Sequence, residues 1–427
     1  MTSLAILGGS PILNKPLTPY NSMGEAEIKA VNNVTRSGKL SCFIGAWCED
    51  FDGGPQIKAF EAAWAKRFGV KHALTVNSNT SGLMAALGAV GLSPGDEVIV
   101  PPMTMSATAM APLIYGGIPV FVDMEPTTFC LDPKLVAQAI TQKTRAILAV
   151  DLFGHPAALH ELRALADRHG IYLIEDAAQA PLAEENGHYA GTVGHIGVFS
   201  LNYHKHIHTG EGGVCVTDDA DLALRLRAIR NHGENIVEPL GINDATNMVG
   251  FNFRMNEMSA AIGIEQLKKI DRLVDERVEI ADRLTAATRN LPGLTPPVVR
   301  DGCRHVYYVW AARYNAAVTG VSRATIAKAL NAEGVPVWEG YVKPLYMLPT
   351  FQRRIAIGRN GWPFTLTDRH YEHGLCPVAE QLYKDELIEF CICSFALSVP
   401  EQAAVIEAFH KVFDNLPALA HLEKESA

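Results

Sequence analysis

Two charged residues each follow a short apolar stretch of the sequence. Asp176 ends the stretch that begins at Ile171, which is apolar enough to predict a buried parallel strand. Lys205 lies in a loop between histidines and glycines, after a second apolar stretch at 196–199 and a hydroxyl at Ser200. In an open α/β sheet, ligands bind where the strands end. We therefore expect Asp176 and Lys205 to face one ligand.

A buried carboxylate and a lysine in one site are typical of pyridoxal phosphate enzymes. The Asp176 carboxylate would keep the pyridine nitrogen of the cofactor protonated, which makes the ring an electron sink. The Lys205 amine would form a Schiff base with the cofactor and, once released, act as a general base. A lysine in a loop is usually a solvated charge, so the prediction depends on Asp176.

Several separated motifs resemble the DegT/StrS family of pyridoxal phosphate-dependent sugar aminotransferases, which have fold type I. They extend from Gly8-Gly9-Ser10-Pro11 to the region 376–380 and include the segments around Asp176 and Lys205. The resemblance implies transfer of an amino group from glutamate or glutamine to a keto sugar, usually nucleotide-linked, or to a keto-cyclitol. Such reactions belong to amino-sugar biosynthesis for polysaccharides or antibiotics. The resemblance also implies a homodimer whose active site is completed across the subunits.

A cluster of small polar residues at 77–82 follows a predicted strand and opens a predicted helix. Free backbone N–H groups at such a turn attract an anion, although ordinary capping of the helix by these hydroxyls is the alternative. Beside Asp176 and Lys205 we favour a phosphate site, with Thr80, Ser81 and Ser200 as donors. The family usually has Ser-Gly-Thr-Ala here, so Asn79 and Ser81 depart from it.

The resemblance implies three further contacts with the cofactor. Gln179 would contact the ring hydroxyl. Met105 stands where the family usually has an aromatic residue stacked on the ring, and a thioether can also pack on a π-face. Asn252, in the segment Gly250-Phe-Asn-Phe-Arg254, would reach the phosphate bound by the other subunit.

Three more residues are candidates for substrate contacts. His232 lies in a polar turn, where a histidine is more often a surface residue than a catalyst. Tyr341 and Lys343 lie in a loop that would face the cofactor in the resembled family. Both have the chemistry to bind a sugar or a carboxylate, and a solvated loop is the alternative interpretation.

Seven short β-type runs, separated by helical lengths of chain, predict a mainly parallel, doubly wound sheet. The runs are 72–76, 97–100, 119–122, 146–150, 172–174, 197–199 and 213–216. Apolar residues from Met255 to Leu291 recur at helical spacing over a length that suggests a break. We place the domain boundary along this stretch, which gives a large domain with its N-terminal arm at 1–270 and a small α+β domain at 271–427.

Four local patterns complete the prediction. Apolar spacing and capping signals indicate helices at 56–68 and 322–333, a strand at 305–314, and a final helix that begins with the capping box Ser398-Val-Pro-Glu401.

Composition limits the other functions that the chain can have. No stretch of the 427 residues approaches the roughly 20 apolar residues of a membrane-spanning helix. Since a signal peptide is also absent, we expect a cytosolic protein without a membrane partner. A net charge of −9 argues against nucleic acid. The eight cysteines lack metal-ligand spacing, so we expect no metal, and we interpret Cys391 and Cys393 as part of a buried strand face.

Two other functions remain open. A pyridoxal phosphate sugar dehydratase has the same fold, but in the dehydratases that resemble this family a histidine replaces the lysine. Lysine is retained here, although His204, His206 and His208 flank it and offer an extra acid or base. A noncatalytic regulator that binds the cofactor is the second alternative, and such proteins usually carry a nucleic-acid-binding module.

Overall fold

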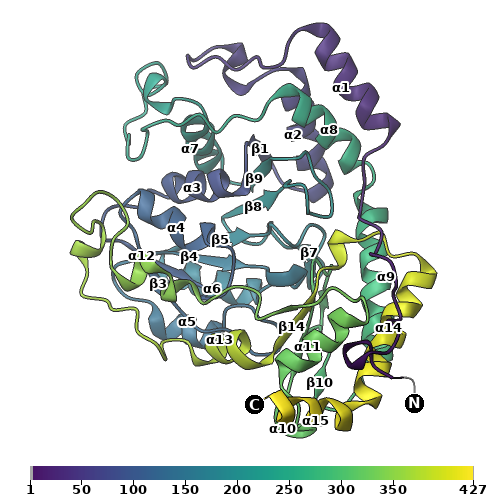
Figure 1. Cartoon of the computed structure of the whole chain (residues 1–427). Helices are drawn as coiled ribbons and strands as arrows, with labels where there is room; N and C mark the ends of the chain where they lie inside the picture. The colour runs from purple at the N-terminus through teal and green to yellow at the C-terminus, as the bar shows by residue number, and fades with distance from the viewer. Residues whose placement is uncertain (1–2, 427) are drawn as a thin grey trace.

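A seven-stranded sheet lies at the centre of the protein, in a computed structural model that describes residues 3–426 (Figure 1). The strands follow the order β1-β9-β8-β5-β4-β2-β3. They are β1 (His72–Val76), β2 (Glu97–Val100), β3 (Ile118–Phe121), β4 (Thr144–Val150), β5 (Tyr172–Asp176), β8 (Ile196–Ser200) and β9 (Gly213–Thr217). The predicted sheet is therefore confirmed.

The directions of the strands bring the candidate site residues to one edge of the sheet. β3, β2, β4, β5 and β8 are parallel, and only β9 runs against its neighbours β8 and β1. β1 consequently points the same way as β8. Gly213, which begins β9, pairs with both Val76 and Ser200, the last residues of those two strands. Asp176 ends β5 beside them.

Helices cover both faces of this sheet, with α3 and α7 above it and α5 below it in Figure 1. The helices of this part are α1 (Glu25–Ser37), α2 (Pro55–Phe68), α3 (Asn79–Ala89), α4 (Ala107–Ile114), α5 (Pro133–Ala139), α6 (Leu159–His169), α7 (Ala220–Arg230) and α8 (Glu257–Leu267). The core strands are almost fully buried, as the continuous apolar stretches predict.

A four-stranded antiparallel sheet of order β10-β12-β14-β13 forms the centre of the second part. Helices α9 and α14 lie side by side against it (Figure 1). Its elements are β10 (Leu294–Thr295), β12 (Trp310–Tyr314), β13 (Trp338–Glu339), β14 (Leu387–Phe390), α9 (Ile270–Thr288), α10 (Ala316–Thr319), α11 (Arg323–Ala332), α12 (Pro349–Gln352), α13 (Pro377–Gln381), α14 (Val399–Asp414) and α15 (Leu416–Ser426). A third, small sheet joins β11 (Cys303–Arg304), β6 (Glu184–Glu185) and β7 (His188–Tyr189).

The local predictions hold with three corrections. The helical pattern predicted from Met255 to Leu291 is broken at Lys268–Lys269, as expected, into α8 and α9. The capping box of Ser398 begins α14, also as predicted. That helix is not the final one, because α15 follows it. The strand predicted at 305–314 covers only Trp310–Tyr314. Cys391 and Cys393 lie beyond β14, where a short 3₁₀ helix (Ile392–Ser394) replaces the predicted strand face.

The two parts of the chain are interleaved. Residues 345–382 leave the small sheet and pack into the core of the large one, where the rings of Tyr346, Phe351 and Tyr371 surround Phe121 at centroid distances of 5.6, 5.0 and 5.7 Å. The boundary at 270 stays a prediction, but the residues after it do not form one separate core. The apolar pattern indicated burial without indicating which core was involved.

The N-terminal arm closes back on the small part of the protein through one buried carboxylate. Glu333 is fully buried and accepts hydrogen bonds from the backbone N–H groups of Ala5 and Ile12 at 2.8 and 3.1 Å. The buried ammonium of Lys411 lies 2.8 Å from the same carboxylate and also donates to Ser10 O. A buried charge needs such partners because it has lost its hydration.

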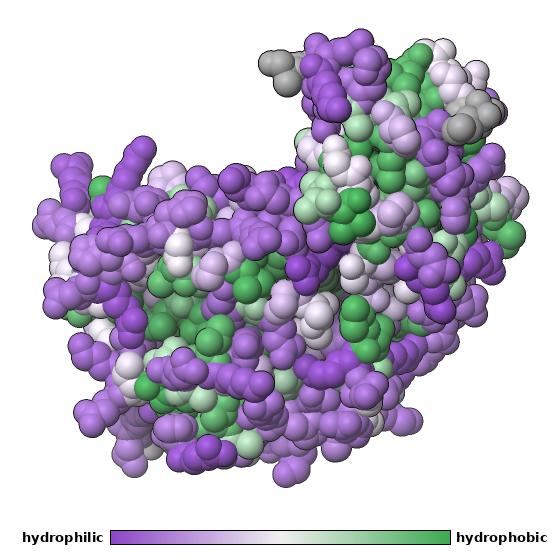
Figure 2. All heavy atoms as spheres, turned by 90° about the horizontal axis from the view of Figure 1, so that it is seen from below, coloured by the Kyte–Doolittle hydropathy of each residue, from purple (hydrophilic) through white to green (hydrophobic). Residues whose placement is uncertain are grey.

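Figure 2 shows a face on which hydrophilic residues predominate and apolar ones gather in patches between them. Within residues 3–426, no helix combines the length and the apolar character that crossing a bilayer requires.

Loss of the Glu333 carboxylate should destabilise the fold strongly. In Glu333→Ala, Lys411 keeps its buried charge without a carboxylate and two backbone N–H groups lose their acceptor. We expect the free energy of unfolding to fall by about 3–5 kcal/mol, measured by urea denaturation. The control Arg272→Ala breaks an exposed pair with Glu276 and should cost less than about 0.5 kcal/mol. Equal losses in the two variants would contradict the prediction.

Candidate active site

A cavity of about 170 Å³ opens at the edge of the sheet where β1, β5 and β8 end. Its lining combines the turn before α3, the loop before α4, the end of β5 and the loop between β8 and β9, which contains Lys205 and is called the lysine loop below. The lining residues include Ser78, Asn79, Thr80, Thr104, Met105, Asp176, Gln179, Ser200, Asn202, His204, Lys205 and Glu211. The structure thus brings Asp176 and Lys205 together, as the sequence predicted.

Lys205 is buried in the cavity wall, with 7% of its surface exposed. Its Nζ lies 4.1 Å from the centroid of the Tyr308 ring, a distance at which the face of the ring attracts the cation. Burial lowers the pKa of Lys205 to about 8, against the opposing charge of Asp176. A larger fraction of neutral, nucleophilic amine is therefore present than on an exposed lysine.

Asp176 is held on both carboxylate oxygens. Oδ1 accepts from the Ala178 N–H and from the Asn79 amide, each at 3.2 Å, and Oδ2 accepts from the Thr108 hydroxyl at 3.2 Å. Burial raises the pKa of Asp176 above its ordinary value, and these donors and Lys205 offset part of that rise. The site can therefore keep a buried negative charge directed at a cationic ring.

Gln179 has both ends of its amide fixed. Its Oε1 accepts from the Phe153 N–H at 2.7 Å, and its Nε2 donates to the Tyr341 hydroxyl at 2.9 Å. Tyr341 adopts a left-handed φ of +58° and packs edge-on against the Phe153 ring at 4.9 Å. The predicted substrate residue Tyr341 thus contacts a neighbour that lines the cavity.

The N-terminus of α3 provides the anion-binding end. Ser78 caps the helix by accepting from the Ser81 N–H, and the first N–H groups of a helix have no intrahelical acceptor. Thr80 and Ser200 line the cavity as expected. Ser81 differs from the expectation, because its hydroxyl is turned back to Asn77 and to Ser78 and its N–H serves the cap. Ser78 lines the cavity in its place.

Gly213 permits this arrangement. A Cβ at Gly213 would lie 2.8 Å from the Ser78 carbonyl carbon and 2.9 Å from the Asn79 nitrogen, both backbone atoms. A side chain at Gly213 would therefore push the start of α3 away from the lysine loop. Gly210 turns the same loop with a left-handed φ of +84°.

The histidines around Lys205 face different surroundings. His204 lines the cavity, and burial followed by the charge of Lys205 lowers its pKa to about 4, so it is neutral at pH 7. His206 is fully buried and donates from Nε2 to Val306 O at 2.8 Å, and burial lowers its pKa to about 3. Of these two, only His204 can meet a ligand in the cavity.

Four predicted residues lie at the rim or outside the lining. Met105 is 62% exposed at the mouth of the cavity. Asn252 accepts from the Arg254 guanidinium at 2.8 Å, and its strand-like bridge is to Asn231. His232 lies in a left-handed turn beside Gly45, and Lys343 is exposed. None of the last three lines the cavity.

The sequence prediction missed Asn79, Thr108, Asn202 and Glu211 as site residues. Asn202 donates to Glu211 at 2.9 Å and both line the cavity, so this pair closes the lysine loop across its base. Their position within a few residues of Lys205 was the only available signal. Asn79 and Thr108 reach Asp176 from distant segments, and no local pattern indicates that contact.

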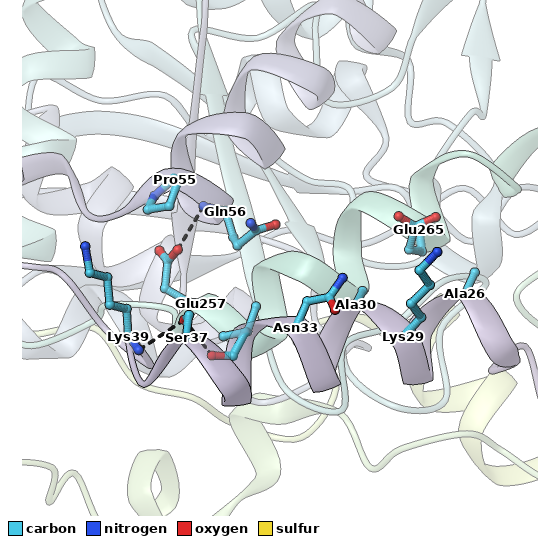
Figure 3. Close-up of a pocket in the computed structure, with 11 residues that line it drawn as sticks. Ala26, Lys29, Ala30, Asn33, Ser37, Lys39, Pro55, Gln56, Glu257 and Glu265 are labelled. Carbon is cyan, nitrogen blue, oxygen red and sulfur yellow. Dashed lines mark hydrogen bonds between the residues drawn. The ribbon is translucent and has the colours of Figure 1, made fainter.

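A larger hollow of about 520 Å³ lies elsewhere, between α1, the start of α2 and α8 (Figure 3). Its buried carboxylate, Glu257, accepts from the N–H groups of Gln56 and Ile57 at 2.8 and 3.4 Å and so caps α2. The Glu257 carboxylate therefore has a structural role as the cap of α2. Among residues 3–426, no group of three histidines, cysteines or carboxylates lies close enough to hold a metal ion.

Comparison with known proteins decides the family. Residues 21–391 match the DegT/DnrJ/EryC1/StrS aminotransferase family. The chain belongs to this family. It is therefore a pyridoxal phosphate-dependent aminotransferase of fold type I, as the sequence motifs indicated.

Relatives align along most of the chain. The L-glutamine:2-deoxy-scyllo-inosose aminotransferase of Streptomyces kanamyceticus is 33% identical over 98% of both chains. The spore coat polysaccharide biosynthesis protein SpsC of Bacillus subtilis is 32% identical over 81% of this chain and 88% of its own. The crystal structure of DesV from S. venezuelae, in complex with a ketimine intermediate, has a TM-score of 0.79 and 31% identity over 94% of this chain and 99% of DesV.

The cavity fits the cofactor of this family. It joins a helix N-terminus for a phosphate, the doubly held carboxylate of Asp176 and the buried amine of Lys205. When bound, pyridoxal phosphate supplies a pyridinium ring that withdraws electrons from the carbon attached to the transferred nitrogen. The chain would supply an anion site, a counter-charge and an amine able to accept and return a proton.

Attachment of the cofactor should depend on the protonation of Lys205. Because only the neutral amine attacks an aldehyde, we expect the rate of attachment to apoprotein to rise about tenfold per pH unit from about pH 6. The rate should level off near pH 8, the pKa of Lys205. Stopped-flow absorbance after mixing with pyridoxal phosphate measures this rate, and Lys205→Arg gives the background. A rate that does not change with pH would contradict the assignment.

Proposed function

We propose that this enzyme transfers the α-amino group of glutamine to a keto-cyclitol. The proposal rests on the relatives named above and on a small cavity whose described lining contains one lysine and no arginine. Nucleotide-linked keto sugars are the second substrate class, since a relative from Caulobacter vibrioides, 35% identical over 73% of this chain, is a GDP-perosamine synthase. The cytosolic location expected from the sequence belongs to the same proposal.

The lining of the cavity favours the uncharged ring. Among the lining residues that the structure describes, Lys205 is the only lysine or arginine, and cofactor attachment removes its charge. Asn202, His204 and Glu211 offer neutral and acidic partners for hydroxyl groups instead. Among its described residues the lining holds no second lysine or arginine, so the cations for a substrate diphosphate would have to come from outside it.

The site residues take the following roles in this proposal. Asp176 would hold the pyridine nitrogen, Gln179 the ring hydroxyl, and Ser78, Thr80 and Ser200 the phosphate. Lys205 would attach the cofactor, and its released amine would carry a proton to and from the donor carbon. Met105 would pack on the ring from the rim. Tyr341 acts through Gln179 by fixing its amide.

We further propose that the enzyme acts as a homodimer in which Asn252 serves the partner's site. Asn252 and His232 lie outside the cavity of their own subunit, and the exposed Val249 lies three residues before Asn252 in the same loop. An asparagine that reaches the phosphate of a second copy would explain why its own cavity does not use it.

Isotope transfer tests the reaction. The enzyme is incubated with [α-¹⁵N]glutamine and scyllo-inosose, and in parallel with a nucleotide-linked keto sugar, and mass spectrometry follows the label. We expect a labelled amino-cyclitol from the wild type and none from Lys205→Ala, whose fold is checked by circular dichroism. Label in the nucleotide sugar alone would replace the substrate class, and a product that loses oxygen without gaining nitrogen would indicate a dehydratase.

Subunit complementation tests the shared site. Lys205→Ala and Asn252→Ala should each be inactive, because each site lacks one contribution. Random mixing gives hybrid dimers with one intact site, and about a quarter of the wild-type activity should return. Tyr383→Phe, which changes a residue outside the cavity lining, serves as the mixing control with Lys205→Ala. No recovery in the Asn252 mixture would contradict sharing.

A further inference from the structure

Asn79 departs from the residues usual in the family and lies at the most buried charge of the site. The glycine usual in the family at this place has no side chain, whereas the Asn79 amide extends from the first turn of α3 into the cavity wall. Its Nδ2 donates to Asp176 Oδ1 and to Val198 O, both at 3.2 Å. The two N–H bonds of the Asn79 amide therefore point to Asp176, the last residue of β5, and to Val198 within β8.

We propose that Asn79 is a positioning residue that keeps the proton on the cofactor side of the contact between Asp176 and the pyridine nitrogen. The proposal rests on the cofactor site described above, and it does not depend on which ketone is aminated. It concerns one proton, shared between a ring nitrogen and a carboxylate oxygen.

The physical argument concerns the basicity of Asp176. Each hydrogen bond donated to a carboxylate stabilises its charged form and makes it a weaker base. A weaker base leaves the shared proton on the nitrogen, which keeps the ring cationic. Asp176 is buried, so burial opposes its charge, and Lys205 loses its own charge when it holds the cofactor. The buried carboxyl of Asp151 behind it adds no positive charge. Neutral donors must therefore supply the stabilisation.

Asn79 and Thr108 share this task on different oxygens. Thr108 donates to Oδ2 and Asn79 to Oδ1, so together they also fix the plane of the carboxylate. The Ala178 N–H supplies the remaining bond to Oδ1. Loss of Asn79 leaves that oxygen with a single donor and frees the carboxylate to turn.

The test is the ¹⁵N resonance of the cofactor, labelled at its pyridine nitrogen and bound to the enzyme without an amino donor. The variants are Asn79→Ala and Asn79→Gly, and glycine restores the residue usual in the family. We expect the resonance to move toward the position of neutral pyridine in both variants, and further in the double variant Asn79→Ala/Thr108→Val. The matched control is Asn331→Ala, which loses two amide bonds to backbone carbonyls at 2.9 and 3.0 Å far from Asp176.

Three results would overturn the proposal. The first is an unchanged resonance in folded Asn79→Ala and Asn79→Gly enzymes that retain the cofactor. The second is loss of the cofactor from both folded variants, which would make Asn79 a binding residue and not a positioning one. The third is an equal displacement in Asn331→Ala, which would assign the effect to general destabilisation. Since no ketone is added, failure of the proposed substrate leaves this measurement unaffected.

Discussion

A carboxylate kept charged inside the protein is the constraint on which the site depends. Asp176 is almost completely buried, and backbone, amide and hydroxyl donors from three segments stabilise its charge. Those donors arrive from α3, from α4 and from the chain just after β5. The position of Lys205 opposite then follows from the end of β8. The sheet is therefore the means by which donors distant in sequence converge on one charge.

The antiparallel strand β9 brings the start of α3 near the lysine loop. Because β9 returns between β8 and β1, its first residue touches the ends of both, and Gly213 lets the start of α3 approach the lysine loop. The anion-binding helix end and the amine are thus neighbours through a single glycine. In a wholly parallel sheet, the same residues would need a longer connection between these ends.

The sequence predicts the strands, and it predicts that Asp176 and Lys205 face one cavity, because continuous apolar stretches and the glycines around the lysine are local signals. It does not predict contacts between distant segments. Tyr341 bonds to Gln179 across 162 positions, and nothing near either residue indicates the other. Ser81 and Asn79 look equivalent in the sequence, yet helix geometry turns Ser81 toward the cap and Asn79 toward Asp176. Side-chain direction at a helix start is decided by the three-dimensional surroundings.

The interleaved core also constrains the order in which the protein can fold during synthesis. Phe121 emerges from the ribosome early, but the rings that cover it, those of Tyr346, Phe351 and Tyr371, emerge more than two hundred residues later. Until then, the nascent large domain must carry an uncovered apolar surface. Such a surface is a natural point for chaperone binding, and for aggregation if translation stops before residue 345.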